Sequence, residues 1–453
     1  MLKITKEYID HFKALLEEED KESILLLIRD LHYADIASVV EELYQDEARQ
    51  FFSYLEGETA SDVLAELDED VQQDILEDLS ATEIVEKYLD PMDSDDAADI
   101  INELPSDIRI EVVSLLEQST EEDAKDVIEL LDYKEDTAGG LMAKELIRVN
   151  MHHTVSQCIK EIREQREEVE DVYAVYVVDE DSTLKGIIPL KNLVLFDAET
   201  MVSDLLDDDI KYARVDTAAE EVAMIMQKYD LVYLPVVNTE NKLVGRITID
   251  DVIDFIKEEA EQDYQLASGI SEDVDHSDKI WVISRSRLPW LILGLFGGIL
   301  ASLVISRHED AIRIYPEMAF FIPIITAMAG NVGIQSSALV VQSLASNTLG
   351  ERTFSHKLFK ELSVALINGL LCSSILLTYG FFFADMPTAI TIGISLLTVI
   401  LLASTLGLII PLFLNRINID PALATGPFIT TSNDIIGLGV YFLIGHYMYA
   451  AFV

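Results

Sequence analysis

The last third of the chain contains five long apolar stretches between Leu288 and Val453. We expect membrane spans at about 288–305, 319–345, 362–383, 390–414 and 424–450, each long enough to cross a hydrocarbon core of ~30 Å. Because a backbone in lipid must satisfy its hydrogen bonds internally, these stretches predict a bundle of five transmembrane helices. The C-terminal part of the chain is therefore restricted to a multi-pass α-helical fold.

The formal net charge of −50 is confined to the part of the chain that precedes these stretches. From residue 278 onward acidic and basic residues are equal in number, so the whole excess lies in the first 277 residues. A region this acidic repels itself at low ionic strength, and divalent cations stabilise it most effectively. It is a poor partner for nucleic acid. Solubility alone is an alternative reason for such a composition.

Residues 1–135 predict an all-α domain of short helices. A loose motif recurs as DIASVVEEL from Asp35, ASDVLAEL from Ala60, DAADIINEL from Asp96 and EDAKDVIELL from Glu122. Each copy begins with an acidic or small residue that can cap a helix and continues as an apolar stripe. Short helices repeated in this way favour a superhelical stack, although the spacing between copies is irregular.

Residues 138–258 contain an internal duplication with strand and helix signals in both copies. The segments YAVYVVDEDSTLKGIIPLKNLV and LVYLPVVNTENKLVGRITIDDVI match at an offset of 59 residues, so that Val177 and Gly186 correspond to Val236 and Gly245. Each copy is preceded by a stretch that predicts a helix. The duplication resembles a pair of CBS (cystathionine-β-synthase-type) domains, which we place at residues 138–200 and 201–258.

Residues 259–283 predict a charged linking helix, after which residues 284–453 form the transmembrane domain. Arg285 and Arg287 precede the first span, and Arg416 follows the fourth. Since basic residues favour the cytoplasmic side, this pattern places the N-terminal domains in the cytoplasm and the C-terminus outside the cell membrane. Arg307 and Arg313, in the first outer loop, oppose that rule.

Asp434 lies within the fifth apolar stretch and is the strongest candidate for a cation site. A carboxylate at that depth costs about 3 kcal/mol, so it is expected to face water or the interior of the bundle. Pro427 removes a backbone donor and frees a carbonyl near Ala424. Thr431 lies on the same stretch, and Asn331 in GNVGIQSSALVVQ is expected to line a polar path. The oxygen chemistry of this set favours hard cations such as Mg²⁺.

The motifs GNVGIQSSALVVQ and DPALATGPFITTSND resemble those of the MgtE family of magnesium channels and transporters. The order of domains is also similar: an acidic helical domain, a CBS pair, a linking helix of the plug type and five spans. The resemblance implies a homodimer with its pore at the subunit interface. It further implies gating, in which cytoplasmic Mg²⁺ bridges acidic domains and holds the pore shut.

By this resemblance Asp434 is similar to the pore carboxylate of the family, Ala424 to the position that offers a backbone carbonyl, and Asp420 to an acidic residue that meets the linking helix through a metal. The other positions that the resemblance implies as metal ligands are acidic residues of the soluble region and the linking helix: Asp62, Asp95, Asp99, Glu220, Asp230, Asp251, Asp254, Glu259 and Asp263. The pairs Asp95–Asp99 and Asp251–Asp254 each share a helix face by spacing. An ordinary solvated surface is the alternative for each.

Three functions remain open from the residues. The first is a Mg²⁺ channel gated by cytoplasmic Mg²⁺, and the second is a carrier for Mn²⁺ or Co²⁺, or one coupled to protons through Asp434. The third is a membrane-anchored sensor whose CBS pair binds nucleotide, for which Asp251 suits a ribose and ATP is the candidate ligand. The chain lacks a P-loop and the motifs of nucleophilic or metal-dependent hydrolases, so we expect no enzyme activity.

Overall fold

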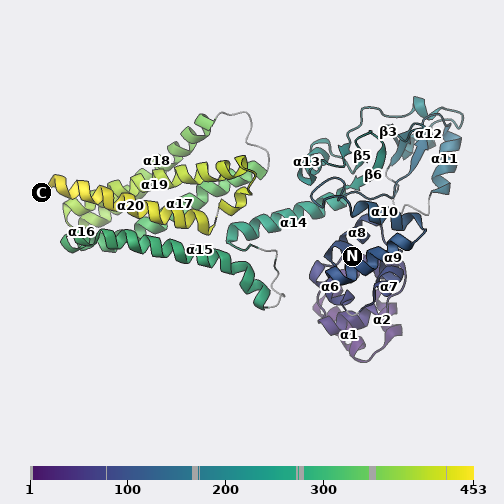
Figure 1. Ribbon diagram of the computed structural model, residues 1–453, viewed down its shortest axis with the longest axis horizontal. Coiled ribbons are helices and arrows are strands. Elements are labelled where there is room, and N and C mark those ends of the chain that lie inside the picture. Colours follow the sequence, from purple (N-terminus) through teal and green to yellow (C-terminus); the bar gives the residue numbers. More distant parts are fainter. Residues whose placement is uncertain are drawn as a thin grey trace. The chain divides into compact units, whose positions relative to one another are not determined.

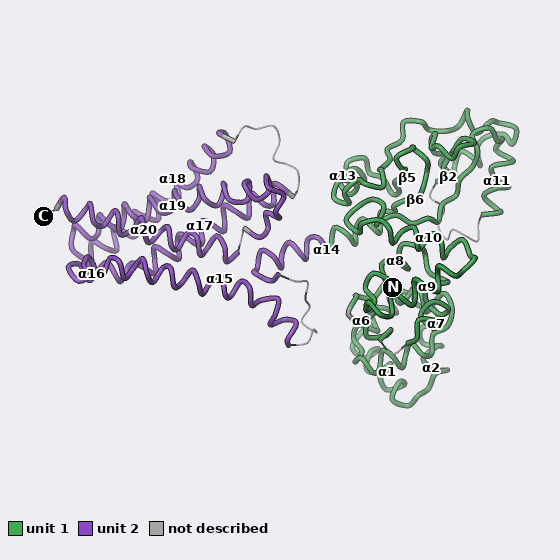
Figure 2. Tube along the Cα trace, in the orientation of Figure 1, with its two compact units in different colours: residues 1–257 green, residues 258–453 purple. Residues whose placement is uncertain are grey.

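The computed structural model describes residues 4–77, 79–165, 172, 174–271, 274, 280–345, 354–424 and 426–452. The chain divides into two compact units, residues Met1–Lys257 and Glu258–Val453, which are coloured separately in Figure 2. The first unit holds short helices and two small sheets, and the second is built almost wholly of long helices (Figure 1).

The first part of unit 1 is a stack of short helices. Their bounds are α1 (Lys6–Glu17), α2 (Lys21–Ile28), α3 (Tyr33–Val40), α4 (Gln45–Phe52), α5 (Glu58–Ala65), α6 (Glu69–Leu76), α7 (Ala81–Ile84), the π-helical turn η1 (Val85–Leu89), α8 (Ser94–Glu103), α9 (Ser106–Gln118) and α10 (Glu122–Leu130). Side chains cap several of them, as where Asp20 accepts a hydrogen bond from the Ser23 amide.

The recurring sequence motif corresponds to every second or third helix of this stack. Its four copies form α3, α5, α8 and α10, and each of these helices packs against the next one. The apolar stripes meet in a continuous core in which Phe12 and Phe51 make an edge-to-face contact, with ring centroids 5.1 Å apart. The all-α prediction for this region is therefore confirmed.

The second part of unit 1 contains the duplicated domains. The first copy comprises β1 (Arg148–Asn150), α11 (Val155–Glu164), β2 (Ala174–Val178), β3 (Leu184–Pro189) and α12 (Leu190–Leu195), followed by the turn η2 (Val202–Asp204). The second comprises β4 (Ala213–Arg214), α13 (Ala219–Tyr229), β5 (Tyr233–Val237), β6 (Leu243–Thr248) and α14 (Ile249–Ser268).

The two sheets repeat each other in register as well as in order. In each, the first strand pairs parallel to the second and the second pairs antiparallel to the third. Val177 lies opposite Gly186, and Val236 lies opposite Gly245, with a bulge one residue later in both copies. A side chain at Gly245 would meet the Ala143 carbonyl oxygen at 2.8 Å, because another backbone segment crosses there. The CBS duplication is thus present in three dimensions.

Unit 2 begins within α14 and continues as a helical bundle. The helices are α15 (Ile280–Arg307), α16 (Glu309–Ile314), α17 (Glu317–Ala345), α18 (Phe354–Phe383), α19 (Met386–Arg416), the turn η3 (Pro421–Ala424) and α20 (Pro427–Phe452). By length and composition, five of these described helices can cross a membrane. Helix α19 lies at the centre, packed against α17, α18 and α20, and α15 packs on α20.

Two details differ from the sequence-based expectations. Pro427 is the first residue of α20 and not an interruption within the span, because η3 ends at Ala424 and α20 begins only at Pro427. Proline is well tolerated at that position, where its missing N–H would have no helical partner. Helix α14 runs without a break from the second CBS domain into the predicted linking segment, and ends at Ser268.

Candidate metal centres

The first candidate centre lies where α8 begins. Glu145, which precedes β1, accepts hydrogen bonds from the Ser94 amide at 3.1 Å and the Ser94 hydroxyl at 2.9 Å. The Lys144 amide donates to the same hydroxyl at 3.0 Å. Glu145 therefore caps α8 from 51 residues away, while Asp93, at the N-cap position itself, makes no capping bond with its side chain.

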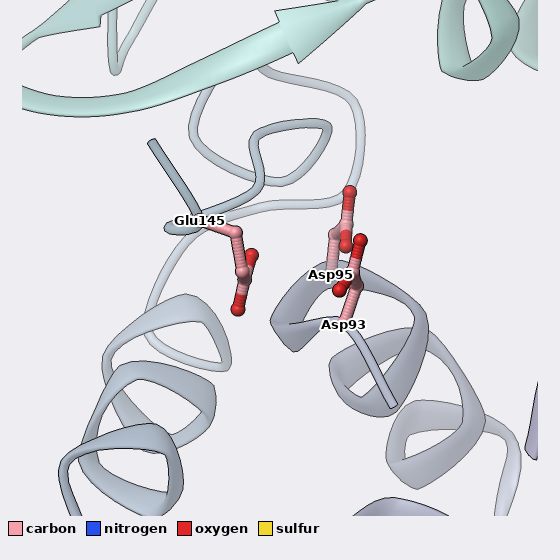
Figure 3. Close-up of side chains that lie close together, drawn as sticks. All are labelled: Asp93, Asp95 and Glu145. Atoms are coloured by element: carbon pink, nitrogen blue, oxygen red, sulfur yellow. The ribbon is translucent and has the colours of Figure 1, made fainter. Parts of the chain in front are cut away.

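Three carboxylates meet at this helix end. One oxygen each of Asp93, Asp95 and Glu145 lie within 4.8 Å of one another, and Figure 3 shows Glu145 across from the two aspartates. Opposite ligands of an octahedral Mg²⁺ are about 4.2 Å apart, since each lies about 2.1 Å from the ion. A small inward movement, or a water in place of one direct contact, adapts this group to Mg²⁺.

The electrostatics of the same region extend to α14, which belongs to the second CBS domain. Burial, and then the charges of Asp96 and Asp251, raise the pKa of Asp95 well above its usual value. Burial also raises the pKa of Asp251, against the hydrogen bonds that its carboxylate accepts from the Thr248 amide at 3.0 Å and hydroxyl at 2.5 Å. Carboxylates of two domains thus disfavour one another's ionisation, and a bound cation would remove that penalty.

A second group of acidic residues that repel one another lies between α5 and α14 in the same unit. The pKa of Glu66, at the end of α5, is raised by burial and then by Asp254, with a smaller contribution from Asp250 on α14. His32 acts in the opposite direction. The contact between the helical domain and α14 is therefore acidic on both sides.

One buried cation partly offsets this acidity. Arg246 on β6 is only 7 % exposed, and its charge lowers the pKa values of Asp93 and Asp251 relative to what burial alone would give. Its backbone amide and carbonyl both pair with Ala143. The backbone of Arg246 is consequently held by the sheet.

The structure brings together only some of the predicted residues of the soluble region. The charge of Asp251 raises the pKa of Asp95, the charge of Asp99 raises that of the neighbouring Asp96, and the charge of Asp254 raises that of Glu66. Asp62 is half-buried on α5. Glu220 and Asp230 are exposed near the two ends of α13, with Asp230 in a left-handed conformation.

Sequence reasoning missed Asp93, Asp96, Glu145, Glu66 and Asp250. The run DSDDAAD from Asp93 was a visible signal, because three of its acids precede or open a predicted helix. Glu145 had no local signal, since its partner is Ser94, far away in the sequence. The contribution of Glu66 depends on packing between domains.

The second candidate centre lies in unit 2 around Asp434, which is half-buried on α20. Its neighbour Asn433 is 2 % exposed and donates from Nδ2 to the Ala329 carbonyl oxygen on α17 at 3.3 Å. Asn433 Oδ1 is buried and has no hydrogen-bond partner within the described residues. Gly333 makes this approach possible, because a methyl group there would overlap the Asn433 amide.

The other predicted residues of the membrane unit lie on α17, at η3 and on the first part of α20. Asn331 is exposed on α17, and Thr431 packs against Gly297 of α15. Asp420 accepts a hydrogen bond from the Ala422 amide at 2.7 Å and so begins η3. The backbone of Ala424 ends η3, and the side chain of Ala424 lies outside the described residues.

The end of α14 packs against the beginning of α20. A side chain at Gly426 would lie 2.5 Å from the Ala267 carbonyl oxygen, and one at Gly269 would lie 2.9 Å from Pro427 Cγ. Gly269 adopts a φ of +81°, which ends α14 in a left-handed turn. Glu259 and Asp263 are half-buried on the same helix.

These features define a class of protein: a multi-pass membrane transport protein with an acidic helical domain and a pair of CBS domains. Family models support each part. They match a divalent cation transporter domain at residues 322–444, the MgtE intracellular N domain at 31–136, and CBS domains at 138–199 and 202–258.

The chain belongs to the MgtE family. It is 31 % identical over 432 residues to the magnesium transporter MgtE of Bacillus subtilis, with 92 % of this chain and 95 % of that protein covered. It is 29 % identical over 441 residues to the magnesium transporter MgtE of Thermus thermophilus, with 96 % and 97 % covered. The predicted family and fold class are confirmed, and the family is one of transporters and not of enzymes.

Solved structures cover the soluble region. The cytosolic domain of the Mg²⁺ channel MgtE in complex with ATP is 31 % identical and has a TM-score of 0.51, with 55 % of this chain and 99 % of that chain covered. The soluble part of a magnesium transporter is 27 % identical with the same TM-score of 0.51, and covers 56 % of this chain and 99 % of its own.

Proposed function

We propose that this protein carries Mg²⁺ into the cell through a pore lined by α20 and α17, with Asp434 as the central ligand. The observation that carries the proposal is a half-buried carboxylate within a membrane span, beside the buried amide of Asn433. Oxygen ligands with space for water suit Mg²⁺, which keeps much of its hydration. Two family relatives of nearly full coverage are magnesium transporters.

Transport of this kind needs no nucleotide hydrolysis. An inside-negative potential of 100 mV contributes about 4.6 kcal/mol to the entry of one divalent ion. We further propose that two copies of the chain assemble as a homodimer, since two Asp434 carboxylates would bind a divalent cation better than one. Ala424, Pro427, Thr431 and Asn331 are proposed to line the path, with the C-terminus outside the cell.

Regulation is proposed to act through the acidic residues of α8 and α14. With Mg²⁺ bound between them, Asp95 and Asp251 are held together, and the end of α14 stays against the start of α20. When cytoplasmic Mg²⁺ falls, the carboxylates repel, α14 moves and the pore opens. Asp62, Asp99, Asp254, Glu259, Asp263 and Asp420, and also the exposed Glu220 and Asp230, are the further proposed ligands.

ATP is a second proposed ligand, at the CBS pair. The support is the relative whose cytosolic domain is in complex with ATP and which is 31 % identical to this chain. Calorimetry with purified full-length protein tests this proposal. Binding that is unaffected by Asp251→Asn would remove that residue from the ribose position.

The transport proposal is tested by current and flux through purified protein in lipid, with cytoplasmic-side Mg²⁺ stepped from near zero to about 10 mM. We expect a Mg²⁺ current that falls as internal Mg²⁺ rises. Asp434→Ala should abolish it while the protein still elutes as the same oligomer. Asp385→Asn is the matched control, because Asp385 caps α19 at the end of a span and asparagine also caps.

Other outcomes identify the alternative functions. Flux of Mn²⁺ or Co²⁺ without Mg²⁺ would assign a different cargo, and flux coupled to pH without current would indicate a proton-coupled carrier. If no metal crosses the membrane but nucleotide binds, the protein is a CBS-based membrane sensor. Undiminished current through Asp434→Ala would move the permeation site elsewhere.

A further inference from the structure

A second carboxylate of the membrane unit lies outside the permeation path described above. Glu361 on α18 accepts hydrogen bonds at a single oxygen, Oε1, from the Ser336 hydroxyl of α17 at 2.5 Å and the Ser404 hydroxyl of α19 at 2.7 Å. The two hydroxyl oxygens are 3.2 Å apart. Ser336 and Ser404 are 4 % and 1 % exposed, so three helices meet at one buried polar contact.

The hydrogen bonds that Glu361 accepts from Ser336 and Ser404 are expected to be stronger than those between neutral groups. Hydrogen bonds to an ionised carboxylate are about twice as strong as neutral ones, and the two donating serines are buried while Glu361 itself is half-buried. The cost of holding a carboxylate there is offset only while both hydroxyls donate to it. Loss of one donor would leave the carboxylate with half of these hydrogen bonds, and loss of both would remove them at the junction of α17, α18 and α19.

The same turn of α17 is fixed from a second direction. On the α19 side, a side chain at Gly407 would lie 2.7 Å from the Gly333 carbonyl oxygen and 2.8 Å from Ser336 Cβ. On the α20 side, Gly333 lies against Asn433, the neighbour of Asp434. Ser336 follows Gly333 by one helical turn, a rise of about 4.5 Å. Helix α17 is therefore in contact on one side with the Glu361 group and on the other with the segment of α20 that holds Asp434.

We infer that Glu361 is a positioning residue for the permeation site. Through Ser336 it fixes the rotation and height of α17, and α17 in turn holds Asn433 and the neighbouring Asp434 in place. Glu361 itself does not bind the transported ion. The inference rests on the proposed function, because it concerns how the Asp434 site is held.

The charge and the hydrogen bonds of Glu361 can be separated by substitution. Glu361→Gln keeps a carbonyl oxygen that accepts from both serines but removes the charge. Ser336→Ala with Ser404→Ala keeps the charge but removes both donors. Removing both donors is expected to be the more harmful change, because it leaves a half-buried carboxylate without its two hydrogen bonds.

The experiment measures initial Mg²⁺ uptake into proteoliposomes, the Mg²⁺ concentration for half-maximal uptake, and the thermal midpoint of each purified full-length variant. We expect Glu361→Gln to transport within about threefold of the unsubstituted protein, and Ser336→Ala/Ser404→Ala to lose about tenfold, with a raised half-maximal concentration. Adding Glu361→Gln to the double variant should restore uptake to within about threefold, because no unpaired charge then remains. A purely structural role would change the thermal midpoint but not the half-maximal concentration.

Several results would overturn the inference. One is normal Mg²⁺ uptake by Ser336→Ala/Ser404→Ala. Another is uptake by the triple variant, with Glu361→Gln added, that is no higher than that of the double variant. Loss of uptake in a well-folded Glu361→Gln variant would make the charge itself part of ion binding. If the double variant does not fold, Ser404→Ala alone is used, with an expected fall of about threefold. Failure of the unsubstituted protein to transport Mg²⁺ refutes the proposed function instead, and is seen before any variant is compared.

Discussion

Gly426→Ala tests whether the contact between α14 and α20 belongs to the shut state. The added methyl group would lie 2.5 Å from the Ala267 carbonyl oxygen, whereas ordinary contacts begin at 3.4 Å, so the two segments must separate by about 0.9 Å. Overpacking of this kind costs about 1–3 kcal/mol. If the contact exists only when the pore is shut, that cost shifts the equilibrium toward the open state by about 5- to 150-fold.

The assay is the current through single or few channels in lipid as cytoplasmic-side Mg²⁺ is raised. We expect the Mg²⁺ concentration that halves the current to increase by at least about fivefold, with the conductance unchanged. Gly439→Ala is the matched control, because it lies on the same helix and a side chain there meets nothing within 4 Å. Unchanged inhibition in Gly426→Ala would refute the reasoning, and so would loss of current, which would assign the contact to the conducting state.

Three further predictions concern the acidic centre and the bundle. The double variant Asp95→Asn/Asp251→Asn should raise the cytoplasmic Mg²⁺ concentration that halves the current about tenfold or more. The control Asp107→Asn, at an exposed position, should leave that concentration unchanged. If the double variant and the control are inhibited at the same Mg²⁺ concentration, Asp95 and Asp251 are not part of the sensor. The raised pKa values of Asp95 and of Asp96, the latter to about 8, mean that the folded protein holds more protons than the unfolded chain, so without Mg²⁺ the thermal midpoint should fall as pH rises from 5 to 8. Added Mg²⁺ should raise the thermal midpoint more at pH 8 than at pH 5, because more carboxylates are then ionised. A Mg²⁺-induced rise that is the same at both pH values would contradict this scheme. Gly333→Ala should separate α17 from α20 and reduce Mg²⁺ uptake about tenfold, whereas Gly439→Ala should transport normally.

The sequence predicted the larger organisation because each part leaves a local pattern. Five apolar stretches indicate five helices whatever packs against them, and the helical motif in the first 135 residues marked α3, α5, α8 and α10. The CBS duplication was visible because Gly186 and Gly245 each lie opposite a buried valine in the same register. Family motifs then supplied Asp434 and the acidic residues of α8 and α14.

The composition of the candidate sites could be predicted only in part. Asp95 and Asp251 come from different domains, and their mutual effect depends on how α8 and α14 pack. Glu145 reaches α8 across 51 residues, and Arg246 is a buried cation within an otherwise ordinary strand. Asn433 stood beside the predicted Asp434, yet only the contact with Ala329 distinguishes it from a residue that faces lipid.

The sequence by itself determined the number of spans, the order of the domains, the confinement of negative charge to the soluble region, and the carboxylate in the last span. These are properties of consecutive residues, so hydrophobicity, charge and helical period are enough to read them. Only the tertiary structure decided which acids face one another, that Pro427 starts α20, and that Glu361 joins three helices through two serines. Those outcomes depend on contacts between residues distant in the chain, and their free energies arise from burial and distance, which no local pattern encodes.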